Sequence, residues 1–500
     1  MHIAFLNPQG NFDPNDSYWT QHPDFGGQLV YVKQVALAMA EMGHTVDILT
    51  RQIKDPDWPE FAERQARYEG IERVRIVRLP AGPERFLRKE LLWSHIVQDW
   101  VPNILSFYEG EGSMPDAFTG HYGDGGLAGV LIEDQTGIPF TFTGHSLGAQ
   151  KMDKLGVTED NLAEMDDHYH FARRLVAERL SMNHSGINIT STQQERFEQY
   201  GHRAYHAAVD VQDDRRFAVI PPGVNLEIFG KDATNPREAQ TQDHVLTMFA
   251  RDLDDDRQQM PAIIASSRLD PKKNLLDLVR AFAQTPELQR LANLVLFTGA
   301  HNDPLRDDSG ASPNEKAVLA DIREVVERYD LWGKISTFSL AGQPALAAAY
   351  RFLAERGSVF ALTALYEPFG LAPLEAAAAG LPLVVTENGG PSESLRDEDT
   401  EYGVLVDPTD PEDIAKGLLR LLSDRATWEG FAQRGRQRVL DRYTWERTAE
   451  GYMTQIEELV AHPDARRPET LLPIHPYFQD ADSENDITLD ELRAIYQPEG

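Results

Sequence analysis

Short apolar runs alternate with amphipathic stretches along the first half of the chain. Ile3–Asn7 is a strand-like apolar run at the start. After a polar loop, Gly26-Gly27 opens a stretch whose apolar residues recur at helical spacing, and Gly43 is a typical helix stop. Val46–Leu49 is the next apolar run. This order predicts a β-α-β unit with glycines at the start of its helix.

The same alternation continues and predicts further buried strands. These are Ala117-Phe118, Phe140–Thr143, Ile187–Thr190 and Phe217–Ile220. We expect a glycine-rich turn after the first of them and a helix that begins at Leu127. Strands that alternate with helices in this way indicate a doubly wound parallel sheet.

A second alternating series follows a charged, weakly periodic stretch. Its predicted strands are Ile263–Ala265, Leu294–Phe297, Ile335–Phe338, Val359–Leu362, Leu383–Val385 and Val404–Val406. The fold class is therefore α/β, with two Rossmann-like domains that face a central cleft.

The domain boundaries follow from these changes of pattern. We expect a Rossmann-like domain over residues 1–225, an acidic linker or insertion over 226–260, and a second Rossmann-like domain over 261–450. Residues 451–500 are expected to form a C-terminal helix and an acidic tail that packs back toward the first domain. The acidic run Asp252–Asp256 lies in the predicted linker, where we interpret it as solvated surface and not as a metal site.

The charge of the chain limits its partners. Lys and Arg number 48 against 80 Asp and Glu, a net charge of −32. Such a field repels nucleic acid and anionic membranes, so neither is an expected partner. It also repels phosphorylated ligands, so any anion site must be built locally from Arg, Lys and backbone amides. Only about 11 of the cations are Lys; a salt-adapted, halophilic surface is one interpretation, and compositional drift is the other.

The chain has no cysteine, which excludes disulfides, thiolate metal sites and cysteine nucleophiles. The first residues form a predicted strand and not a signal peptide. No apolar run approaches the roughly 20 residues that a membrane-spanning helix needs. These features predict a cytoplasmic protein.

The stretch Glu367–Glu375 carries the most chemical information. It follows a predicted strand, and Pro373 fits the first turn of a helix that Gly380 ends. The free amides around Gly370 and Leu371 would then form an anion site suited to a diphosphate, bracketed by two carboxylates suited to sugar hydroxyls. The alternative is that Glu375 merely complements the helix dipole.

Arg268 and Lys273 follow the strand at Ile263–Ser266, at the carboxyl edge where open α/β sheets bind ligands. Two cations there could stabilise a departing diphosphate; otherwise they are solvated charges. Asn388–Pro391 follows another strand and is either a site of close backbone approach to a ligand or an ordinary turn.

Gly144–Gly148 matches the G-x-S-x-G pattern of a serine nucleophile. A serine hydrolase that uses Ser146 is therefore a distant alternative, although that motif belongs to a single-sheet fold. His145 could instead reach a sugar or a leaving group, while Ser146 and Lys151 could bind a phosphate.

Near the C-terminus, Asp480–Asp486 with Glu491 approaches the spacing of a calcium-binding EF-hand loop. Asn485 stands where that loop needs glycine. Thr488 and Glu491 predict a helix capping box, which explains the pattern without calcium.

Together these motifs resemble a known family. Glu367 and Glu375 with seven residues between them, the basic pair Arg268 and Lys273, and the loop Gly26-Gly27-Gln28 are similar to the motifs of the retaining, GT-B fold glycosyltransferases of family 4. The resemblance covers about residues 2 to 460. It implies that the C-terminal half binds a nucleotide sugar and the N-terminal half binds the acceptor.

Four further stretches resemble the branch of this family that transfers glucose from UDP-glucose to fructose 6-phosphate, with retention of configuration. They are Phe5–Phe12, His22–Lys33 (which includes Pro23 and Asp24), His121–Gly126 and Gly144–Lys151. The products would be sucrose 6-phosphate and UDP. The alternatives are a mannosylfructose-phosphate synthase, a sucrose synthase, or a nucleotide-sugar binding module without turnover.

The resemblance also implies residue roles. Catalytic positions would be His145, Glu367, Arg268 and Lys273. The donor would contact Gly27, Arg268, Lys273, Glu367, Phe369, Gly370, Leu371 and Glu375. The acceptor would contact Gly27, Gln28, Lys89, Tyr122, Ser146, Lys151, Arg173, Arg174 and Arg179. No metal or cofactor is implied, and a separate sucrose-phosphate phosphatase is the expected partner enzyme.

Overall fold

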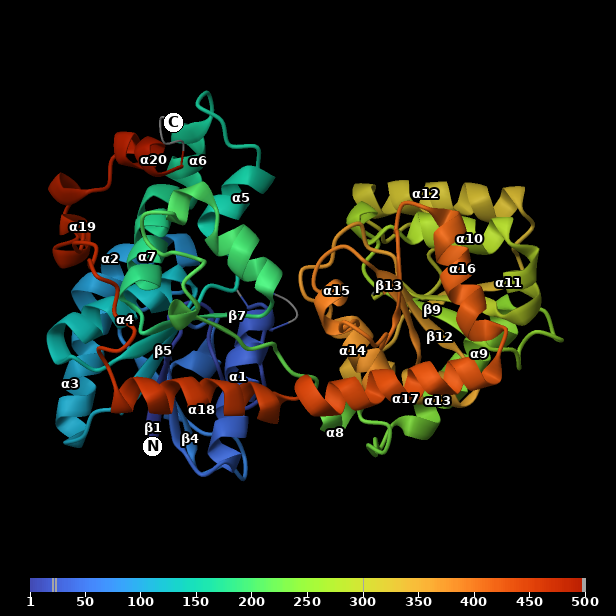
Figure 1. The fold of residues 1–500 in the computed structure, drawn as a ribbon, viewed down its shortest axis with the longest axis horizontal. Helices are drawn as coiled ribbons and strands as arrows, with labels where there is room; N and C mark the ends of the chain where they lie inside the picture. Colours follow the sequence, from blue (N-terminus) through green and yellow to red (C-terminus); the bar gives the residue numbers. More distant parts are fainter. Residues whose placement is uncertain (20–21, 23–24, 300, 497–500) are drawn as a thin grey trace. The chain divides into compact units, whose positions relative to one another are not determined.

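The computed structural model describes residues 1–19, 22, 25–299 and 301–496; Pro23 and Asp24 of the motif above lie outside them. The chain forms two compact units (Figure 1). Unit 1 comprises Met1–Pro221 and Thr448–Gly500, and unit 2 comprises Pro222–Arg447. The long helix α18 (Trp445–Ala461) begins in unit 2 and continues into unit 1.

Unit 1 is built on an eight-stranded sheet in the order β3-β4-β2-β1-β5-β6-β7-β8. Its strands are β1 (His2–Leu6), β2 (Thr45–Arg51), β3 (Gln65–Ala66), β4 (Val74–Leu79), β5 (Ala117–His121), β6 (Phe140–Thr143), β7 (Ile187–Thr190) and β8 (Phe217–Val219). All neighbours are parallel except β3 and β4. The sequence pattern did not predict β3 and β4.

Helices cover both faces of this sheet. One face carries a core in which Ala4 and Leu6 pack with α3 (Val101–Glu111), α4 (Tyr122–Thr136) and α7 (Phe171–His184). The short helices α19 (Pro476–Gln479) and α20 (Leu489–Tyr496) add apolar side chains to the same core. On the other face lie α1 (Gly27–Glu41) and α18, whose Tyr31 and Tyr452 hydroxyls are joined by a hydrogen bond.

Unit 2 is built on a six-stranded parallel sheet in the order β11-β10-β9-β12-β13-β14. Its strands are β9 (Ala262–Ser266), β10 (Asn293–Phe297), β11 (Ile335–Phe338), β12 (Val359–Leu362), β13 (Leu383–Thr386) and β14 (Val404–Val406). Side chains alternate between two cores, with Ile263 and Ala265 in one and Ala262 and Ile264 in the other. A strand that is buried on both faces is apolar throughout, which is why these strands were visible in the sequence.

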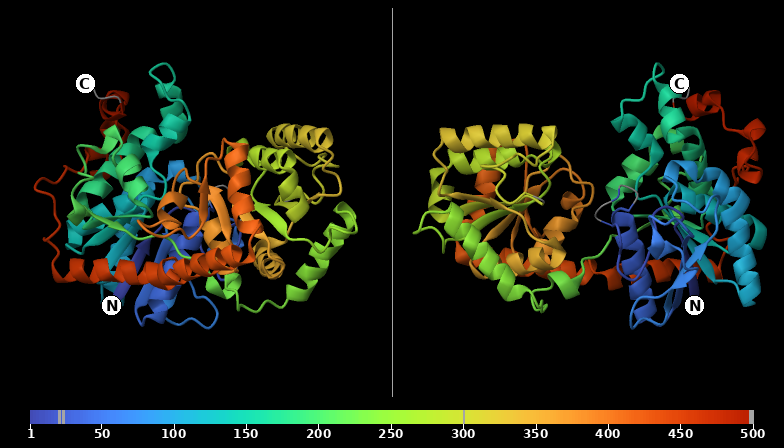
Figure 2. Two further views of the ribbon diagram at one scale, coloured as in Figure 1. Left: turned by 45° about the vertical axis from the view of Figure 1, so that its right-hand side comes forward. Right: turned by 180° about the vertical axis from the view of Figure 1, so that it is seen from behind.

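Two groups of helices cover the unit 2 sheet (Figure 2). One core contains α10 (Leu275–Gln284), α11 (Pro286–Leu291), α12 (Pro313–Arg328) and α16 (Pro411–Leu422). The other contains α8 (Leu226–Phe229), α9 (Glu238–Asp252), α13 (Gly342–Glu355) and α14 (Leu371–Ala378). The helix α17 (Arg425–Arg442) contributes to both.

The expected start of a helix at Leu127 is wrong, because α4 begins five residues earlier, at Tyr122. The glycines predicted to form a turn lie inside the helix. A Cβ at Gly125 would be 2.2 Å from the carbonyl oxygen of Leu6, and one at Gly126 would be 2.3 Å from the hydroxyl of Ser181. These glycines therefore serve close packing of α4 on the sheet and on α7.

The predicted acidic linker at 226–260 is also corrected by the structure. This stretch belongs to unit 2 and forms α8 and α9. Asp252, expected in a solvated run, is only 4% exposed and accepts hydrogen bonds from Arg251, Arg306 and Ser336. Buried carboxylates need such partners, so this aspartate is a structural residue of unit 2.

Two smaller features complete the fold. The capping box predicted near the C-terminus is present: the amide of Thr488 donates to Glu491, and the amide of Glu491 donates to the Thr488 hydroxyl. None of the helices that the structure describes is long and apolar enough to cross a membrane.

Candidate active site

Each sheet has one point at which the strand order reverses. In unit 1 this point lies between β1 and β5, and in unit 2 it lies between β9 and β12. Open α/β sheets bind ligands at the carboxyl ends of the strands at such points. In unit 2, Arg268 follows β9 and Glu367 follows β12; in unit 1, Tyr122 follows β5 directly and Ser146 follows the neighbouring strand β6.

In unit 2, Lys273 and Glu367 meet. The Lys273 ammonium donates a hydrogen bond to Glu367 at 2.8 Å, although 94 residues separate them. Both side chains are partly exposed, and Arg268 nearby in the chain is exposed. The amide of Leu365 donates to the carbonyl of Lys272, so the loops after β9 and β12 are joined by backbone as well. We call Arg268, Lys273 and Glu367–Glu375 the unit 2 loop site.

The loop at Asn388–Pro391 holds Glu367 in place. The amide of Glu367 donates to the Asn388 carbonyl, and the amide of Gly390 donates to the Glu367 carbonyl. A Cβ at Gly389 would lie 2.1 Å from the carbonyl oxygen of Glu367, and one at Gly390 would lie 2.4 Å from that of Phe369. The glycines in this loop are therefore required by the close approach of two protein loops.

The helix α14 begins directly after this loop. Gly370 is its N-cap with a φ of 94°, a conformation that favours glycine. The first amides of a helix have no partner inside it, so those at its start are available to an anion. Burial raises the pKa of Glu375, on the second turn, to about 8, which favours the protonated form of this carboxyl at neutral pH.

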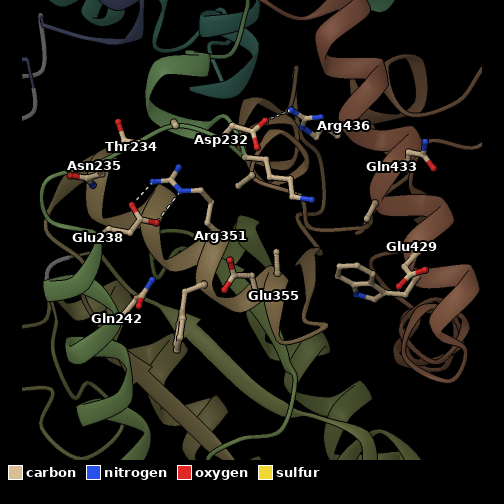
Figure 3. A pocket seen from close by; sticks show the side chains of 18 of the residues that line it. Asp232, Thr234, Asn235, Glu238, Gln242, Arg351, Glu355, Glu429, Gln433 and Arg436 are labelled. Atoms are coloured by element: carbon tan, nitrogen blue, oxygen red, sulfur yellow. Dashed lines mark hydrogen bonds and ion pairs between the residues drawn. The ribbon is translucent and has the colours of Figure 1, made fainter.

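Unit 2 also has two cavities whose linings do not include the residues of the unit 2 loop site. A cavity of about 550 Å³ is lined by Ser339, Leu340 and Ala341, which belong to the loop after β11. A cavity of about 890 Å³ is lined from the ends of α13 and α14, where β12 and β13 begin. It therefore lies at the opposite edge of the sheet, and several of its charged groups pair with each other, as Arg351 does with Glu238 (Figure 3).

In unit 1, a cavity of about 220 Å³ gathers several predicted residues. We call it the unit 1 cavity, and its lining is Gln9, Lys89, Glu90, Trp93, Tyr122, Gly123, Asp124, Ser146, Lys151, Tyr169 and Arg174. Three cations and two carboxylates thus share a small space. Burial raises the pKa of Asp124 to about 7, against the attraction of Arg174 and Lys89.

A buried carboxylate organises the wall of this cavity. Glu178 is fully buried and accepts hydrogen bonds from the Arg174 Nε at 2.8 Å, from the Gly148 amide at 2.9 Å and from the Tyr205 hydroxyl. Arg174 also donates to the carbonyl of Ser146 at 2.6 Å. The Glu178 carboxylate therefore fixes both the Arg174 guanidinium and the loop before α5 (Gly148–Lys154).

His145 stands at a sharp turn beside the cavity. Its φ is 54°, and the amide of Ser146 donates to the carbonyl of Gly144 across it. Its Nε2 lies 2.8 Å from the Nδ1 of His121, the last residue of β5. Burial lowers the pKa of His145 to about 3 and that of His121 well below its usual value, so both rings are neutral. Non-glycine residues at positive φ are costly and cluster at functional sites.

The serine hydrolase alternative finds no support. A serine nucleophile needs a histidine base that a third group orients, usually a carboxylate. The histidine next to Ser146 in the chain is His145. Within the described part of the chain, its imidazole contacts that of His121 and no carboxylate. Ser146 is exposed and lines the unit 1 cavity.

Not every predicted acceptor residue reaches the unit 1 cavity. Arg173 forms a bidentate ion pair with Asp486, and Arg179 donates to the carbonyl of Ala204. Neither lines the cavity. Gly27 and Gln28 are the first two residues of α1, and they do not line it either.

Asp124, Glu178 and His121 were not among the site residues predicted from the sequence. His121 and Asp124 both lie in the motif His121–Gly126, shortly after the predicted strand Ala117-Phe118, and their polar side chains there were an available signal. Glu178 lies mid-helix in an ordinary amphipathic pattern, so only its burial in the structure reveals it.

Comparison with known proteins gives consistent results. A family model described as glycosyl transferase 4-like domain matches residues 26–223, and one described as glycosyl transferases group 1 matches residues 254–438. A probable sucrose-phosphate synthase of Thermosipho melanesiensis is 41% identical over 458 residues, which cover 92% of this chain and 97% of that protein. A probable sucrose-phosphate synthase 2 of Arabidopsis thaliana is 34% identical over 99% of this chain, which spans about half the length of that plant protein.

A solved structure is also similar. The sucrose-phosphate synthase from Thermosynechococcus elongatus matches with a TM-score of 0.61 and 25% identity, over 92% of this chain and 99% of that one. The two parallel-sheet units, the two family models and these relatives confirm the fold class expected from the sequence. The chain belongs to the sucrose-phosphate synthase family of GT-B fold glycosyltransferases.

Proposed function

We propose that this protein transfers glucose from UDP-glucose to fructose 6-phosphate and releases sucrose 6-phosphate and UDP. The observation that carries the proposal is the 41% identity to a probable sucrose-phosphate synthase over nearly the full length of both chains. The resemblance is not confined to one unit, so it covers the residues proposed for both substrates.

The unit 2 loop site is proposed to bind the sugar nucleotide. Arg268, Lys273 and the amides of Gly370 and Leu371 would stabilise the negative charge on the departing diphosphate. Glu367 and Glu375 would accept hydrogen bonds from the hexose and the ribose, respectively. The ion pair between Lys273 and Glu367 supports this assignment, because it places a cation and a hydroxyl-binding carboxylate side by side.

The unit 1 cavity is proposed to bind the acceptor. Lys89, Lys151 and Arg174 line it in a chain of strongly negative net charge. Such a local group of cations is what a phosphate ester needs, and Arg and Lys are its usual ligands in proteins. Gly27, Gln28, Tyr122 and Ser146 remain proposed acceptor contacts, whereas the ion pair of Arg173 leaves that residue a structural role.

In the proposed reaction, a hydroxyl of the acceptor attacks the anomeric carbon on the face from which the diphosphate leaves. A new bond forms between this carbon and the acceptor oxygen, the bond to the diphosphate oxygen breaks, and the hydroxyl proton passes to that oxygen. Configuration is retained without a covalent enzyme intermediate. The cations and amides named above supply the charge stabilisation, so the proposal assigns no role to a metal or cofactor.

The proposal also concerns the surroundings of the enzyme. The product keeps its phosphate ester, so the reaction that consumes it is hydrolysis of that ester by a separate phosphatase. A cytoplasmic location is part of the proposal.

The test is nucleotide release by the purified full-length chain. UDP-, ADP- and GDP-activated glucose and mannose are crossed with fructose and fructose 6-phosphate, at low and at high salt. We expect release only with UDP-glucose and fructose 6-phosphate. Release with GDP-mannose would favour the mannosyl relative, and release with free fructose would favour a sucrose synthase. Donor binding without release in any combination would favour a binding module.

A further inference from the structure

Behind His145, a row of four side chains runs into the sheet of unit 1. The hydroxyl of Thr141 lies 2.9 Å from that of Thr119, which lies 3.2 Å from the Nε2 of His121. The Nδ1 of His121 then lies 2.8 Å from the Nε2 of His145. Thr119 and Thr141 are opposite each other on β5 and β6, so the pairing of these strands sets the first of the three contacts.

The number of hydrogens in this row decides their direction. Each hydroxyl and each neutral imidazole carries one polar hydrogen, so the row has four. Its three contacts use three of them. One hydrogen is left over and must lie at an atom outside the contacts.

The two ends of the row differ in exposure. Thr119, Thr141 and His121 are fully buried. His145 is partly exposed, and its Nδ1 makes no hydrogen bond to the part of the chain that the structure describes. A hydrogen left without an acceptor among buried groups is costly. The spare hydrogen therefore belongs on the Nδ1 of His145, at the open end.

Each of the other hydrogens then points the same way. Thr141 donates to Thr119, Thr119 donates to the Nε2 of His121, and the Nδ1 of His121 donates to the Nε2 of His145. The row has four polar hydrogens only if each imidazole carries one, and the lowered pKa values of His121 and His145 indicate that both rings are neutral. The stacked contact between the two rings, with centroids 5.1 Å apart, holds them in register.

We propose that His121, supported by Thr119 and Thr141, is a positioning residue that holds His145 as its Nδ1–H tautomer and so presents a fixed hydrogen-bond donor to an oxygen atom of the transferred hexose. The proposal rests on the proposed function, in which His145 is the catalytic position that the family resemblance implies. A donor whose direction is set before binding needs no reorganisation when charge develops on the sugar. The strained backbone of His145 is consistent with such a requirement for exact placement.

The first test is a double-mutant cycle. Thr119→Val removes one hydroxyl with little change of shape, and His145→Ala removes the proposed donor. We expect kcat to fall about tenfold in Thr119→Val and about 100-fold in His145→Ala, with little change in the KM of the acceptor. In the His145→Ala background, Thr119→Val should change kcat less than about twofold, because its effect passes through His145. Two independent, additive losses would overturn the proposal.

Two further variants separate this role from a structural one. Thr119→Ser restores the hydroxyl and should recover most of the lost rate. Thr190→Val is the matched control, because Thr190 is also a buried threonine on this sheet and its hydroxyl has no partner in the described chain. We expect Thr190→Val to leave kcat unchanged.

The second test reads the tautomer directly and does not depend on turnover. In protein labelled with ¹⁵N-histidine, the nitrogen signals of His145 are assigned by their loss in His145→Gln. We expect a protonated Nδ1 and a bare Nε2 in the wild type, and a mixture of tautomers in Thr119→Val. A protonated Nε2 in the wild type would overturn the proposal. If the wild type transferred no sugar at all, the proposed function would fail while this spectrum would still decide the tautomer.

Discussion

The unit 1 cavity and the unit 2 loop site hold their charges in different ways. In unit 1, Arg174 is held by the fully buried Glu178, which also fixes two other groups. In unit 2, Lys273 and Glu367 are both partly exposed and Arg268 is exposed. The first site is fixed by a buried network, and the second is formed by loops joined through backbone hydrogen bonds.

This difference suggests how each site responds to its ligand. Breaking a buried charge pair leaves an uncompensated charge, so a change at Glu178 should affect both binding and stability. An exposed pair contributes little to folding, so a change at Lys273 should affect the reaction and not the fold.

The largest effect is expected in unit 2. Lys273→Ala removes a cation next to the proposed leaving group, and such a loss costs about 10²- to 10³-fold in kcat. The melting temperature should change little, because the lysine is partly exposed. Initial rates of UDP release and a thermal melt measure the two quantities.

The matched control is the neighbouring residue. Lys272→Ala removes an exposed lysine that no part of the proposal uses. It should leave kcat within about twofold of the wild type, as surface substitutions usually do. An equal fall of kcat in both variants would mean that kcat depends on the net positive charge of the loop and not on Lys273 itself, which would contradict the proposed role of Lys273.

Much of unit 2 could be predicted from the sequence, and the reason is physical. Its strands are buried on both faces, so each is a continuous apolar run that stands out between polar loops. The residues after β9 and β12 are close in space because parallel strands end at the same edge. This is why Arg268, Lys273 and Glu367 could be grouped before the structure was known.

Unit 1 was less predictable, for two reasons. The strand β4 contains Arg75 and Arg78, which interrupt its apolar pattern. Arg78 can nevertheless be buried, because its guanidinium donates hydrogen bonds to backbone carbonyls. Glu178 and Arg173 look alike in the sequence as charged residues of one helix. Only tertiary contacts separate the buried organiser Glu178 from Arg173, which pairs with Asp486.

The next effect tests the buried network of unit 1. Glu178→Gln removes the charge that Arg174 requires, so the guanidinium should lose its fixed position. We expect the KM for fructose 6-phosphate to rise about tenfold or more and the free energy of unfolding to fall by about 3 kcal/mol. Kinetics over a range of acceptor concentrations and chemical denaturation measure these changes.

Glu164→Gln is the control for this variant, because Glu164 is an exposed glutamate of unit 1. It should leave the KM for fructose 6-phosphate within about twofold of the wild type and the free energy of unfolding within about 0.5 kcal/mol. A Glu178→Gln protein with an unchanged acceptor KM would show that Arg174 does not bind the acceptor phosphate.

A smaller effect is expected where two loops of unit 2 meet. Gly389 has a φ of 101°, and a Cβ there would collide with the carbonyl of Glu367. Gly389→Ala should therefore displace Glu367 and raise the KM for UDP-glucose about tenfold, at a cost of about 1–3 kcal/mol of strain. Gly110→Ala is the control, because a Cβ at this position in α3 meets nothing within 4 Å; helix propensity makes it slightly stabilising. Donor kinetics that are the same in both variants would contradict the role of the loop.

The smallest effect concerns pH at the unit 1 cavity. Burial raises the pKa of Asp124 to about 7, so the carboxyl is mostly neutral at pH 6 and mostly charged at pH 8. Because its folded-state pKa lies above its unfolded value, its contribution to stability is complete below about pH 4 and is lost as the pH rises through 7.

The charged form also repels a phosphate ester, which is already a dianion above about pH 6.5. We therefore expect the KM for fructose 6-phosphate to rise about threefold between pH 6.5 and 8.5 in the wild type and to stay constant in Asp124→Asn. The exposed Asp160→Asn should keep the dependence of the wild type, so a profile that Asp124→Asn leaves unchanged would assign the titration to another group of the cavity.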